Sequence, residues 1–157
     1  MLLGGLSTSV KKNDRINAII KDDMKKMNPV VHFEMPYEDK KRMADFYAKA
    51  FGWKPQMLGP EMGNYVVMHT SEIDKKTKYP TKPGRINGGF FQKDLSKPAQ
   101  YPSVVIAVPD IKEHIKRVTA AGGKVLGKPW DIPGTGLYVS FLDTEGNRVS
   151  IIQPKEM

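Results

Sequence analysis

A histidine and a glutamate stand two residues apart in the segment VVHFEMP, residues 30–36. The β-branched and aromatic residues of this segment predict a strand. Because side chains alternate between the two faces of a strand, His32 and Glu34 share one face, and Phe33 and Met35 share the other. An imidazole and a carboxylate on one face are suited to metal binding, to acid–base catalysis or to a buried polar pair. The segment alone does not choose among these three.

The following residues supply elements that can position this face. YEDKKRMADFYAKAF carries apolar residues at positions 43, 46, 47, 50 and 51, which is the spacing of an amphipathic helix. WKPQML, NYVVMHT and INGGFFQ are then three predicted strands. The first half of the chain is therefore predicted to be a βαβββ unit.

The same order of elements returns in the second half. PSVVIAV predicts a strand, and IKEHIKRVTAAG predicts a helix for which Asp110 and Glu113 form a capping box. KVLGKP, GLYVSFLD and NRVSIIQ predict three more strands. We therefore expect an α+β fold of two tandem βαβββ units, about 28–93 and about 100–154, whose curved mixed sheets form a half-open barrel with the helices outside. The charged residues 1–27 are predicted to be an N-terminal arm or extension preceding a domain of residues 28–157.

Each helix must bury its apolar stripe against one side of the sheet, which leaves the concave side for polar residues. Strand alternation then places Ser103, Arg148 and Ser150 in this hollow with His32 and Glu34. Trp130 falls in the Pro- and Gly-bounded segment KPWDIPGTG, a predicted loop that either closes over a ligand or caps the barrel. Alternation does not fix the faces of four further polar candidates, Asn64, Asn87, Tyr101 and Tyr138, and two histidines, His69 and His114, are predicted to be surface residues.

Composition limits the classes of function. The chain of 157 residues has no cysteine, so a disulfide, a thiolate metal site and a cysteine nucleophile are excluded, and a cytoplasmic location is expected. No apolar run is long enough for a membrane span, so no membrane partner is expected. The net charge is +8, but the lysines are dispersed and no nucleic-acid-binding motif is present, so we expect no nucleic acid partner. The basic loop, residues 74–85, is either a solvated loop or a positive rim that attracts an anionic small molecule.

The longer segments NPVVHFEMPYEDKKRMADFYAKAFGW, GRINGGFF and PGTGLYVSFLDTEGNRVSIIQP give a family resemblance. Together with the repeated βαβββ order, they resemble the vicinal-oxygen-chelate superfamily, which contains glyoxalase I, bleomycin resistance proteins and extradiol dioxygenases. Within it they are similar to a branch described as related to lactoylglutathione lyase. The resemblance covers roughly residues 28–154.

The resemblance implies a ligand set for a metal. Metal-using members hold the ion from the concave face, commonly with His, Glu, His and Glu on four strands. His32 matches the first position, whereas the second falls near Gly88 or Gly89, the third at Ser103 and the fourth at Ser150. Glycine offers no ligand, and serine is a poor ligand for zinc or nickel. We therefore expect no metal cofactor, with a divalent metal at His32 as the less favoured case.

Two functions follow from the resemblance. The first is binding of a small molecule, anionic or neutral, in a concave pocket without the family's metal, in the manner of bleomycin resistance proteins. That pocket would be lined by His32, Glu34, Ser103, Trp130 and Ser150. The alternative is a lyase or isomerase related to lactoylglutathione lyase that uses His32 and Glu34, with or without a divalent metal. The resemblance also implies a homodimer.

Overall fold

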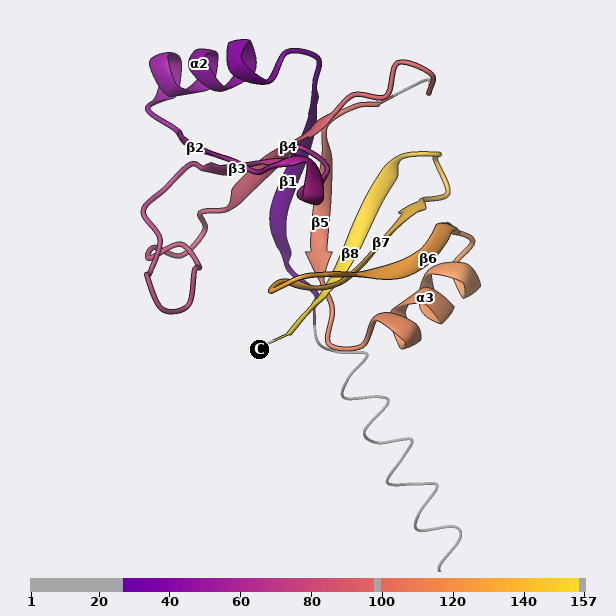
Figure 1. The fold of residues 1–157 in the computed structure, drawn as a ribbon. Coiled ribbons are helices and arrows are strands. Elements are labelled where there is room, and N and C mark those ends of the chain that lie inside the picture. The colour runs from indigo at the N-terminus through magenta and orange to yellow at the C-terminus, as the bar shows by residue number, and fades with distance from the viewer. Residues whose placement is uncertain (1–26, 98–99, 156–157) are drawn as a thin grey trace, which may run out of the picture.

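The computed structural model describes residues 27–97 and 100–155, whose arrangement is shown in Figure 1. The predicted N-terminal arm, except for Met27, lies outside these ranges. No helix in the described ranges is both long and apolar enough to cross a bilayer. In chain order the elements are β1 (Val30–Tyr37), α2 (Lys40–Phe51), β2 (Lys54–Met57), the short 3-10 helix η1 (Pro60–Met62), β3 (Val66–His69), β4 (Asn87–Gln92), β5 (Ser103–Ala107), α3 (Ile111–Ala120), β6 (Lys124–Ile132), β7 (Gly136–Leu142) and β8 (Arg148–Pro154).

The strands form one mixed sheet of eight, in the order β2-β3-β4-β1-β5-β8-β7-β6. Within each half, the first strand pairs in parallel with the last, β1 with β4 and β5 with β8. The antiparallel pair β1–β5 joins the two halves at the centre of the sheet. The predicted α+β fold of two tandem βαβββ units with a curved, unclosed sheet is confirmed, and the units are joined within one chain (Figure 1).

Local sequence signals set the ends of both helices. Asp39 precedes α2, and its Oδ1 accepts a hydrogen bond from the Arg42 amide at 2.8 Å. Asp110 accepts one from the Glu113 amide at 2.9 Å in the same way, as the capping pattern predicts. Gly52 ends α2 with a φ of 68°, a left-handed conformation that glycine adopts without steric cost.

Two apolar clusters, one in each half, lie on the helix side of the sheet. Phe33 and Met35 of β1 pack against the first cluster, which confirms the predicted inward face of that strand. Because neighbouring side chains alternate, His32 and Glu34 are on the concave side. The buried members are Tyr37, Val66, Met68 and Phe90 in the first cluster, and Val108, Ile111, Val139 and Ile151 in the second.

The prediction of a loop around Trp130 was wrong. Strand β6 continues to Ile132, and Trp130 pairs with Tyr138 of β7. The register shifts between Leu126 and Trp130, where Gly127 has a φ of 83°. Glycine and proline here indicate a loop locally, but an irregularity in an antiparallel pair accommodates both residues without ending the strand.

Candidate functional site

His32 and Glu34 lie side by side on β1, at the centre of the sheet, and each is hydrogen-bonded to a tyrosine. His32 Nε2 is 2.9 Å from the Tyr65 hydroxyl, and the Tyr138 hydroxyl donates to Glu34 Oε2 at 2.7 Å. Tyr65 directly precedes β3 in the first half, whereas Tyr138 is on β7 in the second half. The two halves of the chain thus each supply one hydroxyl to the polar residues of the central strand.

The polar contacts continue from Glu34 into a network across the second half. The Tyr138 oxygen is 2.7 Å from Ser150 Oγ, which in turn is 3.0 Å from Ser140 Oγ. Arg148 Nη2 donates to Ser140 Oγ at 3.1 Å. Ser150 is fully buried. We call these five residues, Glu34, Tyr138, Ser140, Arg148 and Ser150, the concave network.

Burial controls the protonation of this face. It lowers the pKa of His32 from 6.5 to about 4, so the imidazole is neutral at pH 7. Burial also raises the pKa of Glu34, and this effect exceeds the opposing effects of the Tyr138 hydrogen bond and the Arg148 charge. The pKa of Tyr138 is raised to about 12, chiefly by burial and then by the Glu34 charge. The pKa of Tyr65 is raised for the same two reasons, so both phenols remain protonated donors.

Arg148 brings a positive charge to the network. Its side chain is exposed, and the guanidinium carbon lies 5.8 Å from the centre of the Phe91 ring. Within the described ranges Arg148 forms no ion pair with a carboxylate. An exposed guanidinium that rests on an aromatic ring is well placed to bind a carboxylate or phosphate.

The structure distinguishes the two glycines at the family's second metal position. A Cβ at Gly88 would overlap the Phe33 ring on the helix side, whereas a Cβ at Gly89 would overlap the ring and hydroxyl of Tyr65. Gly89 is also the residue opposite Glu34 in the β1–β4 pair. Tyr65 therefore fills the space in which a metal-binding side chain would project.

The remaining positions do not complete a metal site. Ser103 lies opposite Glu34 on β5, and the Ser150 hydroxyl is engaged by Tyr138 and Ser140. No group of three or more His, Cys, Asp or Glu side chains with the geometry to hold an ion occurs in the described part of the chain. The four family positions hold one histidine, two serines and a glycine whose side-chain space Tyr65 fills, and these residues do not fit the family's divalent ion.

The predicted pocket residues are brought together around Tyr138 more than around His32. Trp130, with 54% of its surface exposed, meets the Tyr138 ring edge-on at 6.4 Å between ring centres. Glu34 and Ser150 contact the Tyr138 hydroxyl directly, as described above. Ser103 is on the same face, but in the described structure its side chain makes no hydrogen bond to the network.

Sequence reasoning missed Tyr65 and Ser140. For Tyr65 the available signal was the period of 2, because it stands next to the apolar Val66, which the structure places in the first core. Ser140 is two residues from Tyr138 and shares its face, but alternation in the sequence did not fix the face of Tyr138. His69 is not a simple surface residue either. It is half-buried, and its Nδ1 atom is buried without a hydrogen-bond partner in the described structure.

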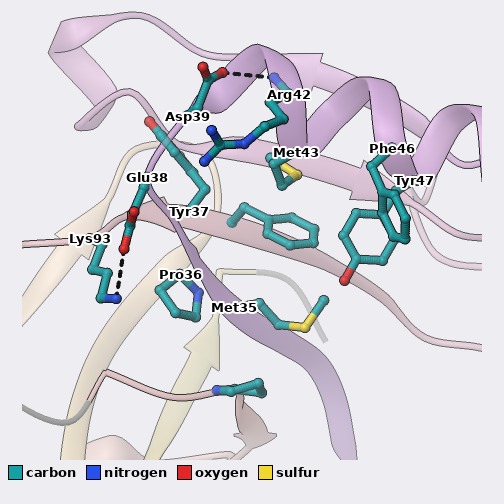
Figure 2. A pocket seen from close by; sticks show the side chains of 12 residues that line it. Met35, Pro36, Tyr37, Glu38, Asp39, Arg42, Met43, Phe46, Tyr47 and Lys93 are labelled. Atoms are coloured by element: carbon teal, nitrogen blue, oxygen red, sulfur yellow. Dashed lines mark hydrogen bonds and ion pairs between the residues drawn. The ribbon is translucent and has the colours of Figure 1, made fainter.

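A cleft of about 550 Å³ lies elsewhere, between α2 and the adjoining strands β1 and β4 (Figure 2). Met35, Met43 and Phe90 line it, so it is on the helix side of the sheet, opposite to His32 and Glu34. This cleft is therefore not the pocket that the sequence predicts on the concave side.

Comparisons with known proteins agree with the fold. The family model of the Glyoxalase/Bleomycin resistance protein/Dioxygenase superfamily matches residues 30–151. The chain is 30% identical over 125 residues to the anthracycline biosynthesis protein DnrV of Streptomyces peucetius, a match that covers 73% of this chain but only 42% of that protein.

Solved structures share the architecture at low sequence identity. The hypothetical protein BH1468 from Bacillus halodurans C-125 superposes with a TM-score of 0.62 at 16% identity, covering 84% of this chain and 98% of that one. Methylmalonyl-CoA epimerase from Mycobacterium tuberculosis gives a TM-score of 0.56 at 12% identity, with coverage of 80% and 87%. The family model matches most of the chain, and the fold and the order of its eight strands agree with that match. The chain belongs to the Glyoxalase/Bleomycin resistance protein/Dioxygenase superfamily.

Proposed function

We propose that this protein binds a small aromatic molecule with an anionic group on the concave side of its sheet, without a metal ion. Trp130 and Phe91 would contact the aromatic body, and Arg148 would pair with the anionic group. The main support is the concave network, in which polar side chains from β1, β7 and β8 meet beside an exposed guanidinium. Polar groups that converge between aromatic side chains are typical of small-molecule sites.

Two further observations support the proposal. Tyr65 fills the space over Gly89, which disfavours a metal-dependent reaction at this site. The relative DnrV is described as an anthracycline biosynthesis protein, and anthracyclines are aromatic, which agrees with the aromatic walls proposed here.

Calorimetric titration with 1-naphthoate tests the proposal, with the neutral 1-naphthamide as the matched ligand. We expect naphthoate to bind the wild-type chain and naphthamide to bind more weakly. Arg148→Gln should weaken naphthoate binding about fivefold, since an ion pair of an exposed arginine is lost. Arg85→Gln, in the exposed basic loop, is the control and should leave binding unchanged.

Equal binding of both compounds to wild type and Arg148→Gln would contradict the role of Arg148. Native mass spectrometry of the purified chain gives an independent check, because a co-purifying compound would identify the natural ligand class. Elemental analysis of the same purified protein measures its metal content. A stoichiometric metal that disappears in His32→Ala would overturn the metal-free proposal.

The second candidate function is a lyase or isomerase that uses His32 and Glu34. Its support is the pair of perturbed pKa values on one strand, because such shifts are frequent at catalytic sites. A neutral imidazole can accept a proton, and a carboxyl group whose pKa is raised by burial is a better proton acceptor when ionised than an ordinary carboxylate. Turnover of the hemithioacetal of glutathione and methylglyoxal, lost in Glu34→Gln but unaffected by chelator, would favour this function over simple binding.

The assembly and the location of the protein are also proposals. The family resemblance supports a homodimer, and the absence of cysteine supports a cytoplasmic location. The chain spans less than half the length of DnrV, so the activity of that longer protein is not transferred to this chain.

A further inference from the structure

The two helices of the fold pack differently against the sheet. Ile111 of α3 is completely buried, and Ile115 also packs in the second core. On α2 the only fully buried residue is the small Ala44, and the helix meets the first core through the larger Met43 and Tyr47. Tyr47 stacks on Trp53 at 4.9 Å between ring centres, beyond the C-terminal end of α2. The cleft extends along α2 from Arg42 and Met43 to Phe46 and Tyr47.

This cleft is large enough for a ligand and has an apolar floor. Its volume of about 550 Å³ is within the range of small-molecule sites. Met35 of β1 and Met43 of α2 point into it, as Figure 2 shows, and Phe46 and Phe90 also line it. Methionine side chains are flexible and polarizable, so they adapt to an aliphatic chain.

The charged rim of the cleft leaves one cation without a partner. Lys93 pairs with Glu38 at 2.9 Å, and Asp39 caps the backbone of α2 (Figure 2). Arg42 also lines the cleft, but its guanidinium forms no ion pair or hydrogen bond with the part of the chain that the structure describes. A guanidinium above an apolar floor is complementary to a molecule with an anionic head and a hydrocarbon tail.

We propose that the cleft between α2 and β1–β4 is a second binding site, which takes a linear carboxylate with Arg42 at its head group and Met35 and Met43 along its tail. The site is separate from the concave network, because Met35 and Glu34 are on opposite faces of β1. Occupation would fill space that the packing of α2 leaves open, so the ligand should also stabilise the first half of the fold.

Titration with decanoate tests this site, with decanol as the neutral ligand of equal length. The readout is NMR of methyl-labelled methionine, with Met35 and Met43 assigned through their leucine variants. We expect both methyl signals to shift with decanoate while that of Met57, on β2 and outside the cleft, remains in place. Arg42→Gln, which removes an ion pair of an exposed arginine, should weaken decanoate binding about fivefold and leave decanol binding unchanged. Arg85→Gln is the matched control with no expected effect.

Three outcomes would overturn the proposal. The first is no shift of Met35 and Met43 at millimolar decanoate. The second is equal affinity for decanoate and decanol in wild type and Arg42→Gln, which would remove the role of the cation. The third is loss of decanoate binding in Arg148→Gln with binding retained in Arg42→Gln, which would place the ligand on the concave side. Naphthoate binding that fails while decanoate binding succeeds would contradict only the proposed function of the concave site.

Discussion

At Glu34, burial and hydrogen bonding act on the same carboxyl group in opposite directions. Burial raises its pKa, whereas the hydroxyl of Tyr138 and the charge of Arg148 favour the ionised form. The bond from Tyr138 is therefore the main local support for a carboxylate in this position. His32 has no comparable charged partner, and burial alone lowers its pKa. The two residues that the sequence places side by side are thus stabilised by different tyrosines.

Replacement of Tyr138 tests the support of Glu34. Tyr138→Phe should lower the free energy of unfolding by about 1–3 kcal/mol at pH 7, because a buried carboxylate loses its donor. The variant should also raise the pKa of Glu34, so the loss should shrink when the pH falls and the carboxyl group becomes protonated. Urea denaturation at pH 7 and pH 4.5 measures both effects. Tyr79→Phe, at an exposed tyrosine, is the control, and equal losses in the two variants would contradict the prediction.

The pKa of His32 predicts a loss of stability in acid. The unfolded chain binds a proton at His32 near pH 6.5, whereas the folded chain binds it only near pH 4. Stability from this residue is therefore complete above pH 6.5 and is lost as the pH falls toward 4, by at most about 3 kcal/mol. Because the pKa of Glu34 is raised, the contribution of Glu34 to stability increases as the pH falls, opposite to that of His32. Both proteins that are compared must therefore retain Glu34.

Thermal unfolding of wild type and His32→Gln between pH 7 and pH 4.5 separates these contributions. We expect the melting temperature of the wild type to fall more steeply over this window than that of the variant. Parallel curves would show that the imidazole of His32 can be protonated without cost in the folded state.

At the scale of elements, the approach of β3 to β4 determines the chemistry of the concave side. Gly89 leaves room for the ring of Tyr65, and Tyr65 in turn reaches His32. A side chain at position 89 and the ring of Tyr65 cannot occupy the same space. The loss of a metal-ligand position and the hydrogen bond of His32 are therefore two consequences of one packing arrangement.

Substitution of Gly89 tests this coupling. Gly89→Ala should destabilise the fold by about 1–3 kcal/mol, because the added methyl group displaces Tyr65. In a Tyr65→Ala background the same substitution should cost much less, since the obstructing ring is gone. Gly59→Ala is the control, because the atoms nearest to its methyl group would be the carboxylate end of the flexible Glu61 side chain. Additive losses in the chemical denaturation of the double variant would contradict the coupling.

At the scale of the whole molecule, one chain joins both βαβββ units through β1 and β5 and leaves β2 and β6 at the ends of the sheet. Each terminal strand has an unpaired edge in the described structure. Such edges offer backbone donors and acceptors to another chain. Both βαβββ units are already joined in the sheet of one chain. A second copy of the chain would therefore extend this sheet at an edge and would not supply a missing strand of either unit.

Sedimentation equilibrium tests the homodimer that the family resemblance implies. We expect a mass of twice 17.6 kDa at high micromolar concentration, with dissociation on dilution. A single species of 17.6 kDa over the whole concentration range would contradict the dimer.

The sequence by itself determined the features that depend on neighbouring residues. The period of 2 assigned the two faces of β1, and the capping residue Asp110 and the terminal Gly52 set the ends of helices, because these patterns are read within one turn or one strand. The order βαβββ followed from the same local patterns. His32, Glu34, Ser150 and Arg148 were therefore placed on the concave side before the fold was known.

Only the tertiary structure decided how these side chains are partnered. Tyr65 and His32 are 33 residues apart, and Tyr138 and Glu34 are 104 residues apart, so their bonds depend on strand pairing and not on local pattern. The same holds for Trp130. The neighbouring proline and glycine residues predict a loop, but Trp130 belongs to β6 because it pairs with Tyr138 of β7. Long-range register brings together residues whose separation in the chain carries no periodic signal, and this is why the partners of the site appeared only in the folded molecule.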